Sequence, residues 1–221
     1  MLEELRLFQL ISPALPIGGF TYSQGLEWAV EEGWVNHADS FAAWLTGILQ
    51  DSIATLELPV LLRLQQAFSA GDLSAVHHWC NWLLACRETK ELRLEERQRG
   101  AALAKLLPQL DIAIPEPAAK AIASTQLAGL ALAADQWQIA PDKLCIGYSW
   151  SWLENYVTAG IKLIPLGQTQ GQQLLLQLAT LIPTTLSSAK ELDDADVGSY
   201  TPAVSIASSL HEHQYTRLFR S

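Results

Sequence analysis

The spacing of apolar residues constrains this chain to helices. Between residues 41 and 49, apolar side chains stand at positions i, i+3, i+4, i+7 and i+8: Phe41, Trp44, Leu45, Ile48 and Leu49. This spacing places them on one stripe of an α-helix. Alternation of apolar and polar residues is scarce, and turn signals lie too far apart for hairpins. The sequence predicts an all-α fold, a single-domain helical bundle of roughly eight to ten helices over residues 1–221.

Apolar periodicity and turn residues place the individual helices. A cap at Asp39 or Ser40 would start the helix described above, and Pro59 lies near the first turn of the next helix or kinks it. The segment 108–116 is expected to be irregular, and a loop rich in Asp and Gly should follow residue 181. The predicted helical segments are 3–11, 20–32, 56–68, 73–86, 87–105, 118–134, 141–164, 167–181 and 203–213.

Composition excludes several classes of protein. The chain has 14 Lys and Arg against 23 Asp and Glu, a net charge of −9, which argues against nucleic acid as a partner. The most apolar stretch, 121–134, is interrupted by polar residues, so we expect no membrane span. The acidic start, with Glu3 and Glu4, does not resemble a signal peptide, and three cysteines without a CxxC motif suit a reducing compartment. We expect a cytoplasmic protein.

The cations are concentrated in one segment. Residues 87–105 hold six Lys and Arg and four Glu, so this segment carries +2 and the rest of the chain −11. The spacing favours pairs within one solvated helix. The alternative is a charged face that docks a complementary protein.

Familiar catalytic motifs are missing from the sequence. It contains no GxxxxGK[ST] and no GxGxxG after a strand, so nucleotide binding would belong to a partner. No Ser or Cys stands in a recognised nucleophile motif. His77 and Cys80 share a helix face, and His211 and His213 flank Glu212, but neither set gives three convergent metal ligands. Surface or capping histidines are the simpler interpretation, and a site shared across a dimer is the alternative.

The last residues have an unusual composition. The segment Tyr215–Ser221 reads YTRLFRS, which is basic and apolar at the end of an acidic chain. A flexible tail over about 214–221 that becomes ordered against a partner would explain it.

Three blocks of sequence together resemble one family. They are LISPALPIGGFTYSQGLE (10–27), KLIPLGQTQGQQLL (162–175) and HEHQYTRLFRS (211–221), and the charged segment RETKELRLEERQRGAAL (87–103) is similar to the charged helix of that family. In this combination and order the chain is identified as a member of the UreF family of urease accessory proteins.

The resemblance implies a function without a catalytic site. Proteins of this family are all-α, usually homodimeric, and bridge the accessory protein D, called H in some organisms, and the GTPase G. The complex is a GTP-hydrolysis-dependent chaperone that delivers nickel to the urease apoprotein. By this resemblance the chain has no cofactor of its own: the complex handles nickel, and the partner binds GTP.

The resemblance also assigns residue roles. Phe20, beside Tyr22, occupies the aromatic position that faces the GTPase, and Arg217 corresponds to the tail Arg that becomes ordered when D binds and helps to recruit the GTPase. Leu218, Phe219 and Arg220 complete that block. Trp150 falls in the dimer-forming helix, where Ile146 replaces an Arg of some members. From the residues themselves, Gly18, Gly19 and Gly25 indicate tight backbone turns, with partner contact as the alternative.

Three other hypotheses stay open at this point. One is a direct nickel metallochaperone that uses His211, His213 or His77. Another is a helical enzyme, which would need a pocket with convergent titratable groups. Within the scaffold hypothesis, Arg217 or Arg220 could reach the partner's GTPase site as an arginine finger.

Overall fold

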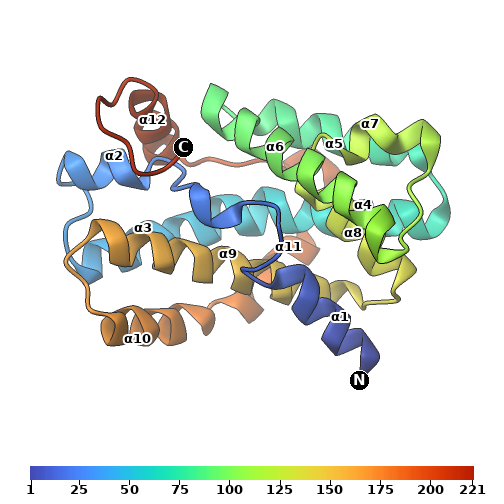
Figure 1. The fold of residues 1–221 in the computed structure, drawn as a ribbon, viewed down its shortest axis with the longest axis horizontal. Coiled ribbons are helices and arrows are strands. Elements are labelled where there is room, and N and C mark those ends of the chain that lie inside the picture. Colours follow the sequence, from blue (N-terminus) through green and yellow to red (C-terminus); the bar gives the residue numbers. More distant parts are fainter.

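The computed structural model describes all residues, Met1–Ser221, and every regular element in it is helical (Figure 1). Counting the continuous helix described below once and leaving out the four-residue α7, the α-helices number ten, at the upper end of the predicted range. The α-helices are α1 (Leu2–Ile11), α2 (Leu26–Glu31), α3 (Ala38–Ile48), α4 (Leu58–Ala70), α5 (Leu73–Cys86), α6 (Lys90–Leu106), α7 (Ala119–Ile122), α8 (Gln126–Gln136), α9 (Pro141–Leu163), α10 (Gln168–Ala179), α11 (Ile182–Glu191) and α12 (Pro202–His211).

Short 3-10 helices and one π-helical stretch complete the structure. The 3-10 helices are η1 (Gly19–Thr21), η3 (Leu107–Leu110), η4 (Glu116–Ala118) and η5 (Asp194–Asp196). The π-helical stretch η2 (Leu49–Glu57) joins α3 to α4 into one continuous helix.

The helix stays continuous across Pro59 because the π-helical stretch and the linker between α11 and α12 accommodate the proline. Proline has no N–H to donate to the carbonyl of Thr55, four residues earlier, and would kink a regular helix. Here the wider π turns precede it, and the N–H of Gly198 donates to the Thr55 carbonyl at 2.9 Å. The N–H of Tyr200 satisfies the Asp51 carbonyl in the same way, also at 2.9 Å. The linker between α11 and α12 therefore replaces the bonds that the π stretch and the proline remove.

The long helix Ala38–Ala70 is also apolar enough to cross a membrane by length and composition. Two thirds of its apolar window, 67%, is buried inside the bundle, as in a core helix of a soluble protein. The stretch 121–134, the most apolar one expected from sequence, is instead divided between α7 and α8.

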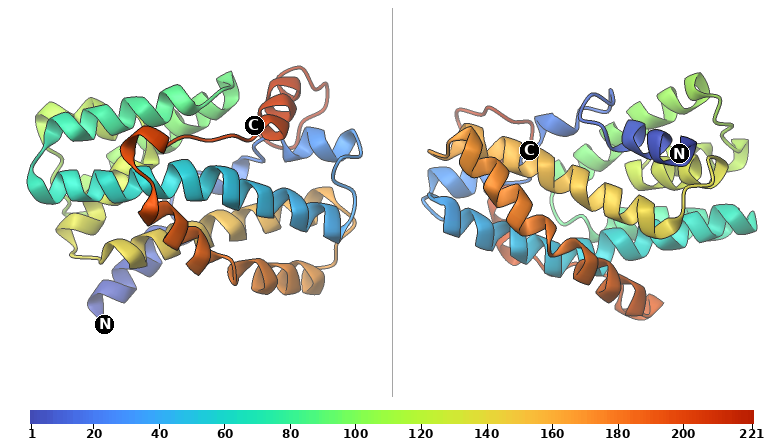
Figure 2. Two further views of the ribbon diagram at one scale, coloured as in Figure 1. Left: turned by 180° about the vertical axis from the view of Figure 1, so that it is seen from behind. Right: turned by 90° about the horizontal axis from the view of Figure 1, so that it is seen from below.

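The core is one cluster of 54 buried residues gathered around α4, α8 and α9. The long helix α9 crosses the middle of the molecule, with α1, α10 and α11 packed against it (Figure 2). Close packing with α3 requires a glycine, because a Cβ on Gly160 would lie 2.3 Å from the Phe41 ring. Cys80 and Cys145 are buried in this core, and burial raises the pKa of both thiols to about 12, which suits small apolar side chains.

Several predicted boundaries were wrong. The helix predicted from residue 118 to 134 breaks at Ala123–Thr125, where the Thr125 side chain caps α8 and its backbone lies against Gly100 of α6. The segment after residue 181 is not only a loop, because α11 occupies Ile182–Glu191 with proline in its first turn. The cap of α3 is His37, which forms a capping box with Ser40.

Candidate partner-docking site

The N-terminal loop, residues 12–25 between α1 and α2, meets the C-terminal tail, residues 214–221, beside α2 (Figure 1). The N–H of Arg220 donates to the Thr21 carbonyl at 2.9 Å. The Ser221 carbonyl oxygen accepts from the N–H groups of Ser23 and Gln24, at 2.6 and 3.0 Å, and from the Ser23 hydroxyl at 2.6 Å. These bonds join two segments that are about 200 residues apart in sequence and that both belong to the candidate site.

Two glycines shape the loop on either side of this junction. Gly18 and Gly25 have φ values of 72° and 84°, in the left-handed region that favours glycine. A Cβ on Gly25 would also lie 2.7 Å from the backbone nitrogen of Ser208, so α12 packs directly on this turn. Gly19 begins the short 3-10 turn η1, and a Cβ there would lie 3.3 Å from the Arg99 guanidinium.

The acidic side chains of α6 face inward. Glu91, Glu95 and Glu96 are buried, so the prediction of a solvated, salt-bridged helix was wrong for this face. One ion pair forms within the helix, between Arg99 and Glu95 at 3.0 Å. Burial raises the pKa of Glu95, while Arg99 and Gln24 oppose that rise. The exposed face carries the cations Lys90, Arg97 and Lys105, the polar Gln98 and the apolar Leu94.

Arg87 lies between two of the buried carboxylates. Its guanidinium pairs with Glu57 of the π-helical stretch at 2.7 Å and with Glu96 of α6 at 3.0 Å. Glu57 also accepts from Ser52, and Glu96 from the Thr125 hydroxyl at 2.5 Å. We call Arg87, Glu57 and Glu96 the inner network; it ties α6 to the long helix and to the cap of α8.

A second set of charges fixes the tail. His211 at the end of α12 is fully buried, with Nδ1 2.7 Å from Glu91 and Nε2 3.3 Å from Glu27. The Glu27 carboxylate also accepts the backbone N–H groups of Leu218 and Phe219, at 2.6 and 2.9 Å. Arg217 completes the set, 3.0 Å from the second oxygen of Glu91. We call Glu27, Glu91, His211 and Arg217 the tail cluster.

The predicted tail residues divide into an outer and an inner group. Phe219 is buried, with Lys162 5.7 Å from its ring centroid, and Ser221 is buried beside it. Leu218 is 65% exposed, and the Arg217 side chain 42%. Each residue from Arg217 to Ser221 is bonded within its own chain, although the side chains of Arg217 and Leu218 stay exposed.

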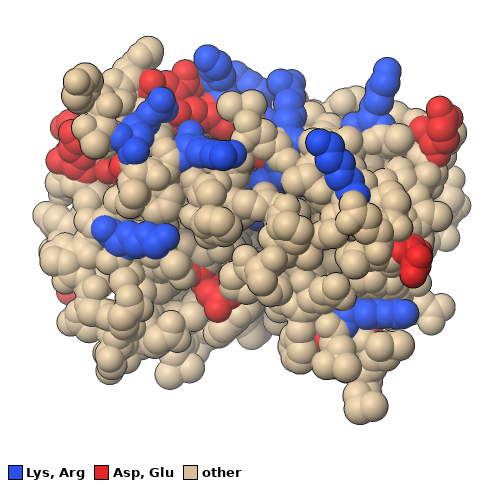
Figure 3. Space-filling model, viewed as in Figure 1, with Lys and Arg blue, Asp and Glu red and all other residues tan.

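The aromatic pair of the N-terminal loop divides in the same way. Phe20 is 54% exposed, whereas Tyr22 is buried and its hydroxyl donates to Gln98 of α6 at 2.7 Å. An open groove of about 580 Å³ lies between α6 and the tail, lined by Tyr22, Lys90, Leu94, Gln98, Arg217 and Arg220 among others. Lys and Arg side chains gather along this side of the molecule (Figure 3).

The histidines do not form the metal site considered above. His211 is held between two carboxylates, so the interpretation as a surface or capping residue was wrong for it, while His213 is exposed. His77 contacts the Pro117 carbonyl at 3.0 Å. No group of three or more His, Cys, Asp and Glu side chains is arranged to hold a metal ion.

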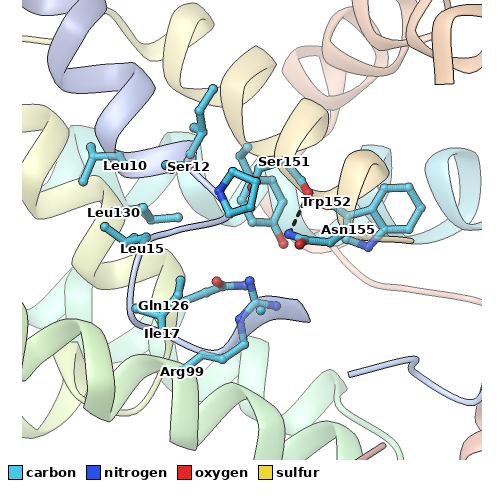
Figure 4. A pocket seen from close by; sticks show the side chains of 14 residues that line it. Leu10, Ser12, Leu15, Ile17, Arg99, Gln126, Leu130, Ser151, Trp152 and Asn155 are labelled. Atoms are coloured by element: carbon cyan, nitrogen blue, oxygen red, sulfur yellow. Dashed lines mark hydrogen bonds between the residues drawn. The ribbon is translucent and has the colours of Figure 1, made fainter. Parts of the chain in front are cut away.

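A small cavity lies behind η1, between the N-terminal loop and α9 (Figure 4). Arg99 and Asn155 point into it, and its volume is about 30 Å³. Such a space holds a water molecule rather than a substrate. This cavity does not provide the pocket that the helical-enzyme hypothesis requires.

Apolar side chains remain exposed on α1 and α9. Trp150 is 37% exposed and Ile146, one turn earlier, 45%, so both lie on the outer face of α9. Leu5 and Phe8 of the neighbouring α1 are 58% and 61% exposed. A pair of packed helices thus carries apolar surface that its own chain does not cover.

Sequence reasoning overlooked the acidic residues of the site. Glu27, Glu91 and Glu95 are buried and paired with segments far away in sequence, and helical periodicity assigns such residues to solvent. The one sequence feature that could have indicated them is that Glu27 and His211 lie within the two terminal blocks that carry the resemblance.

Comparison with known proteins agrees with the resemblance. The model of the UreF family matches residues 35–179. A urease accessory protein UreF of Alcanivorax borkumensis is 53% identical over 222 residues, covering 98% of this chain and 97% of the relative. UreF proteins of Pseudomonas putida and Alkalilimnicola ehrlichii are 52% and 49% identical, covering 98% and 100% of this chain and 97% and 96% of their own lengths. The chain therefore belongs to the UreF family of urease accessory proteins.

Proposed function

We propose that this protein is a non-catalytic scaffold in the maturation of urease, required for functional incorporation of the nickel metallocentre. In this role it bridges accessory protein D (H) and the GTPase G in the cytoplasm, within a complex that hydrolyses GTP and loads the apourease. Nickel is the cargo of the complex, and GTP is bound by the partner. Family membership and the absence of a phosphate-binding motif support this proposal.

The observation that carries the proposal is the junction of the N-terminal loop with the tail. Backbone bonds at Thr21 and Ser23 hold the two segments together, while Phe20, Arg217 and Leu218 stay exposed around them. An apolar, aromatic and basic surface of this kind is typical of the central residues of protein interfaces. Because the backbone beneath it is already bonded, a partner would meet a preformed surface, which lowers the entropic cost of binding.

We propose a homodimer through the outer faces of α1 and α9. Its support is the exposed apolar surface of Trp150, Ile146, Leu5 and Phe8 on two helices that pack together. Paired about a twofold axis, such a surface would bury the same residues on each subunit.

A pull-down from cells that express this chain with accessory proteins D (H) and G tests the docking surface. The variant Arg217→Ala with Leu218→Ala, and separately Phe20→Ala, should lose at least one partner, because these side chains are exposed and not part of the core. The control is Leu176→Ala on α10, a side chain that is 73% exposed and distant from the tail in sequence. Normal capture of both partners by the first two variants would refute the proposal.

Coupling to nucleotide turnover has its own assay. If the scaffold shifts the GTPase between states, the rate of GTP hydrolysis by G should change on addition of the complex with D (H). Arg217→Ala and Arg220→Ala proteins would show whether either guanidinium acts as an arginine finger. A rate that the scaffold leaves unchanged would remove the regulatory role.

A further inference from the structure

His211 is placed between two carboxylates that both face its ring. Nδ1 lies 2.7 Å from Glu91 and Nε2 lies 3.3 Å from Glu27, and the side chain has no exposure to solvent. A neutral imidazole has one N–H and one lone pair, so it can donate to only one of the two carboxylates. Its other nitrogen would then face a carboxylate oxygen without a proton between them. Only the imidazolium donates to both.

The charge balance of the tail cluster leads to the same protonation state. Glu27 and Glu91 bring two negative charges into a buried site, and Arg217 supplies one positive charge. The second positive charge can come from His211. Without it, a buried carboxylate is left uncompensated, which is costly in a region of low dielectric constant.

Other charged groups surround the cluster but are engaged elsewhere or lie at its rim. Glu95 of α6 pairs with Arg99, and Glu31 of α2 accepts from Gln214. Lys162 of α9 lies over the Phe219 ring. The groove beside the cluster is lined by the remaining neighbours, which are Tyr22, Lys90, Glu212 and Arg220.

The same two carboxylates hold the tail. Glu27 accepts the N–H groups of Leu218 and Phe219, and Glu91 pairs with Arg217. His211 therefore neutralises and orients the groups to which three consecutive tail residues bind. The ring itself does not contact residues 217–219 through any hydrogen bond, so it acts as a positioning residue.

We propose that the His211 imidazolium is a proton-dependent latch, which keeps residues 217–219 docked on α2 and α6 and releases them when it loses its proton. This inference rests on the proposed function, in that those residues form the partner-docking surface. The latch makes presentation of that surface depend on pH in the free protein.

The direction of the pH dependence follows from the surroundings of the ring. Burial alone would lower the pKa of His211, but hydrogen bonds and charge attraction from Glu91 and Glu27 together raise it above its ordinary value of 6.5. The value of 6.5 belongs to a free imidazole, so it describes a released state in which the ring, together with residues 217–219, has left Glu27 and Glu91. Relative to that state, the stabilisation of the docked tail is fully present below pH 6.5. That stabilisation is lost as the pH rises through the raised pKa.

Amide hydrogen exchange on the full-length protein, without partners, measures docking directly. The Leu218 and Phe219 amides report on the bonds to Glu27, and rates are corrected with a peptide standard of residues 214–221 at each pH. We expect protection of both amides at pH 6 and its loss as the His211 ring titrates. Nitrogen-15 spectra of the ring should show both nitrogens protonated at pH 6 in the same sample.

Two variants and one control separate a latch from simple packing. His211→Gln can never be charged, so its tail amides should be poorly protected and independent of pH between 6 and 9. Glu27→Gln keeps an acceptor for the tail but removes one charge, so the ring should lose its proton at a lower pH than in the wild type. His213→Gln, which alters an exposed ring two residues away, should retain the wild-type pH profile.

The outcomes are decisive even if His211→Gln does not fold. In the wild type alone, a singly protonated ring at pH 6, or tail protection that does not change while the ring titrates, would overturn the latch. A normal latch with no partner capture would instead refute only the docking function. Capture of the partners without pH-dependent protection of the tail amides would refute the latch and leave the docking function in place.

Discussion

The inner network and the tail cluster are built on the same helix and differ in what balances their charge. In the inner network, Arg87 lies between Glu57 and Glu96 and cannot lose its proton under physiological conditions. In the tail cluster, one turn or so towards the N-terminus of α6, Glu91 is paired with a histidine and with an Arg that is 42% exposed. Two neighbouring turns of α6 therefore differ: Glu96 is held by a permanent cation, and Glu91 is held in part by a group that can lose its proton.

What each network holds also differs. The inner network joins α6 to the long helix and to the cap of α8, all of which belong to the core. The tail cluster joins α6 and α2 to the terminal segment 214–221, in which only Phe219 and Ser221 are buried. The first network therefore joins elements of the core, and the second holds the tail whose exposed residues form the proposed docking surface.

The largest effect on stability is expected from Arg87→Ala. Removal of this guanidinium leaves Glu57 and Glu96 buried without a counter-charge, which should lower the free energy of unfolding by about 3–5 kcal/mol. Chemical denaturation at pH 7 measures it. Adding Glu57→Gln to the variant should restore part of the loss, and a loss below about 1 kcal/mol would show that the network is not structural.

Gly25→Ala should have the next largest effect, because Gly25 lies where α12 packs on the start of α2, which carries Glu27 of the tail cluster. An alanine must adopt φ near 84°, which costs about 1–2 kcal/mol, and its Cβ would lie 2.7 Å from α12. Gly18→Ala is a matched control: its φ is also positive, at 72°, but the nearest atom is 3.7 Å away. Thermal unfolding of both proteins should show the larger loss for Gly25→Ala; equal losses would contradict the close packing on α12.

His211→Gln should cost about 1–3 kcal/mol at pH 6, because the buried carboxylates of Glu27 and Glu91 lose the charged donor between them and keep only their bonds to the tail. Because the pKa of His211 is raised, the difference from wild type should shrink as the pH rises above 6.5. Denaturation curves at a series of pH values check this. A difference that grows with pH would give the ring the opposite role.

Arg217→Ala should have the smallest effect on stability, below about 1 kcal/mol, because its ion pair with Glu91 is partly exposed and screened. Phe219→Ala, two residues away, removes a buried ring and should cost about 3–5 kcal/mol. Denaturation of the two variants side by side tests the division of the tail into outer and inner residues. Similar losses would contradict it.

Sequence alone predicted the helical architecture where periodicity was undisturbed. The predicted segment 73–86 coincides with α5, and 141–164 differs from α9 by one residue. The break before α8 depends on contacts of Thr125 with Glu96 and Gly100, which local patterns do not encode. The two terminal blocks that carry the resemblance are bonded to each other in the structure.

The charge arrangement of the site could not be predicted in this way. A run of alternating Glu and Arg on a helix indicates a solvated face, and only the packing of α2, α12 and the tail against α6 shows that its glutamates are buried. For the same reason composition does not show that the tail is bonded to its own chain: Arg220 and Ser221 bond to residues 21–24, and residues 217–219 bond to Glu27 and Glu91.

Deletion of the whole tail is consequently a poor test of docking, because it would also remove buried Phe219 and Ser221. The most direct measurement is co-expression of this chain with accessory proteins D (H) and G and the urease apoprotein, scoring captured partners and nickel-dependent urease activity. The variant Arg217→Ala with Leu218→Ala should be folded but lose both readouts, while Leu176→Ala retains them. Full partner capture and full urease activity in the first variant would contradict a scaffold that acts through the exposed part of its tail.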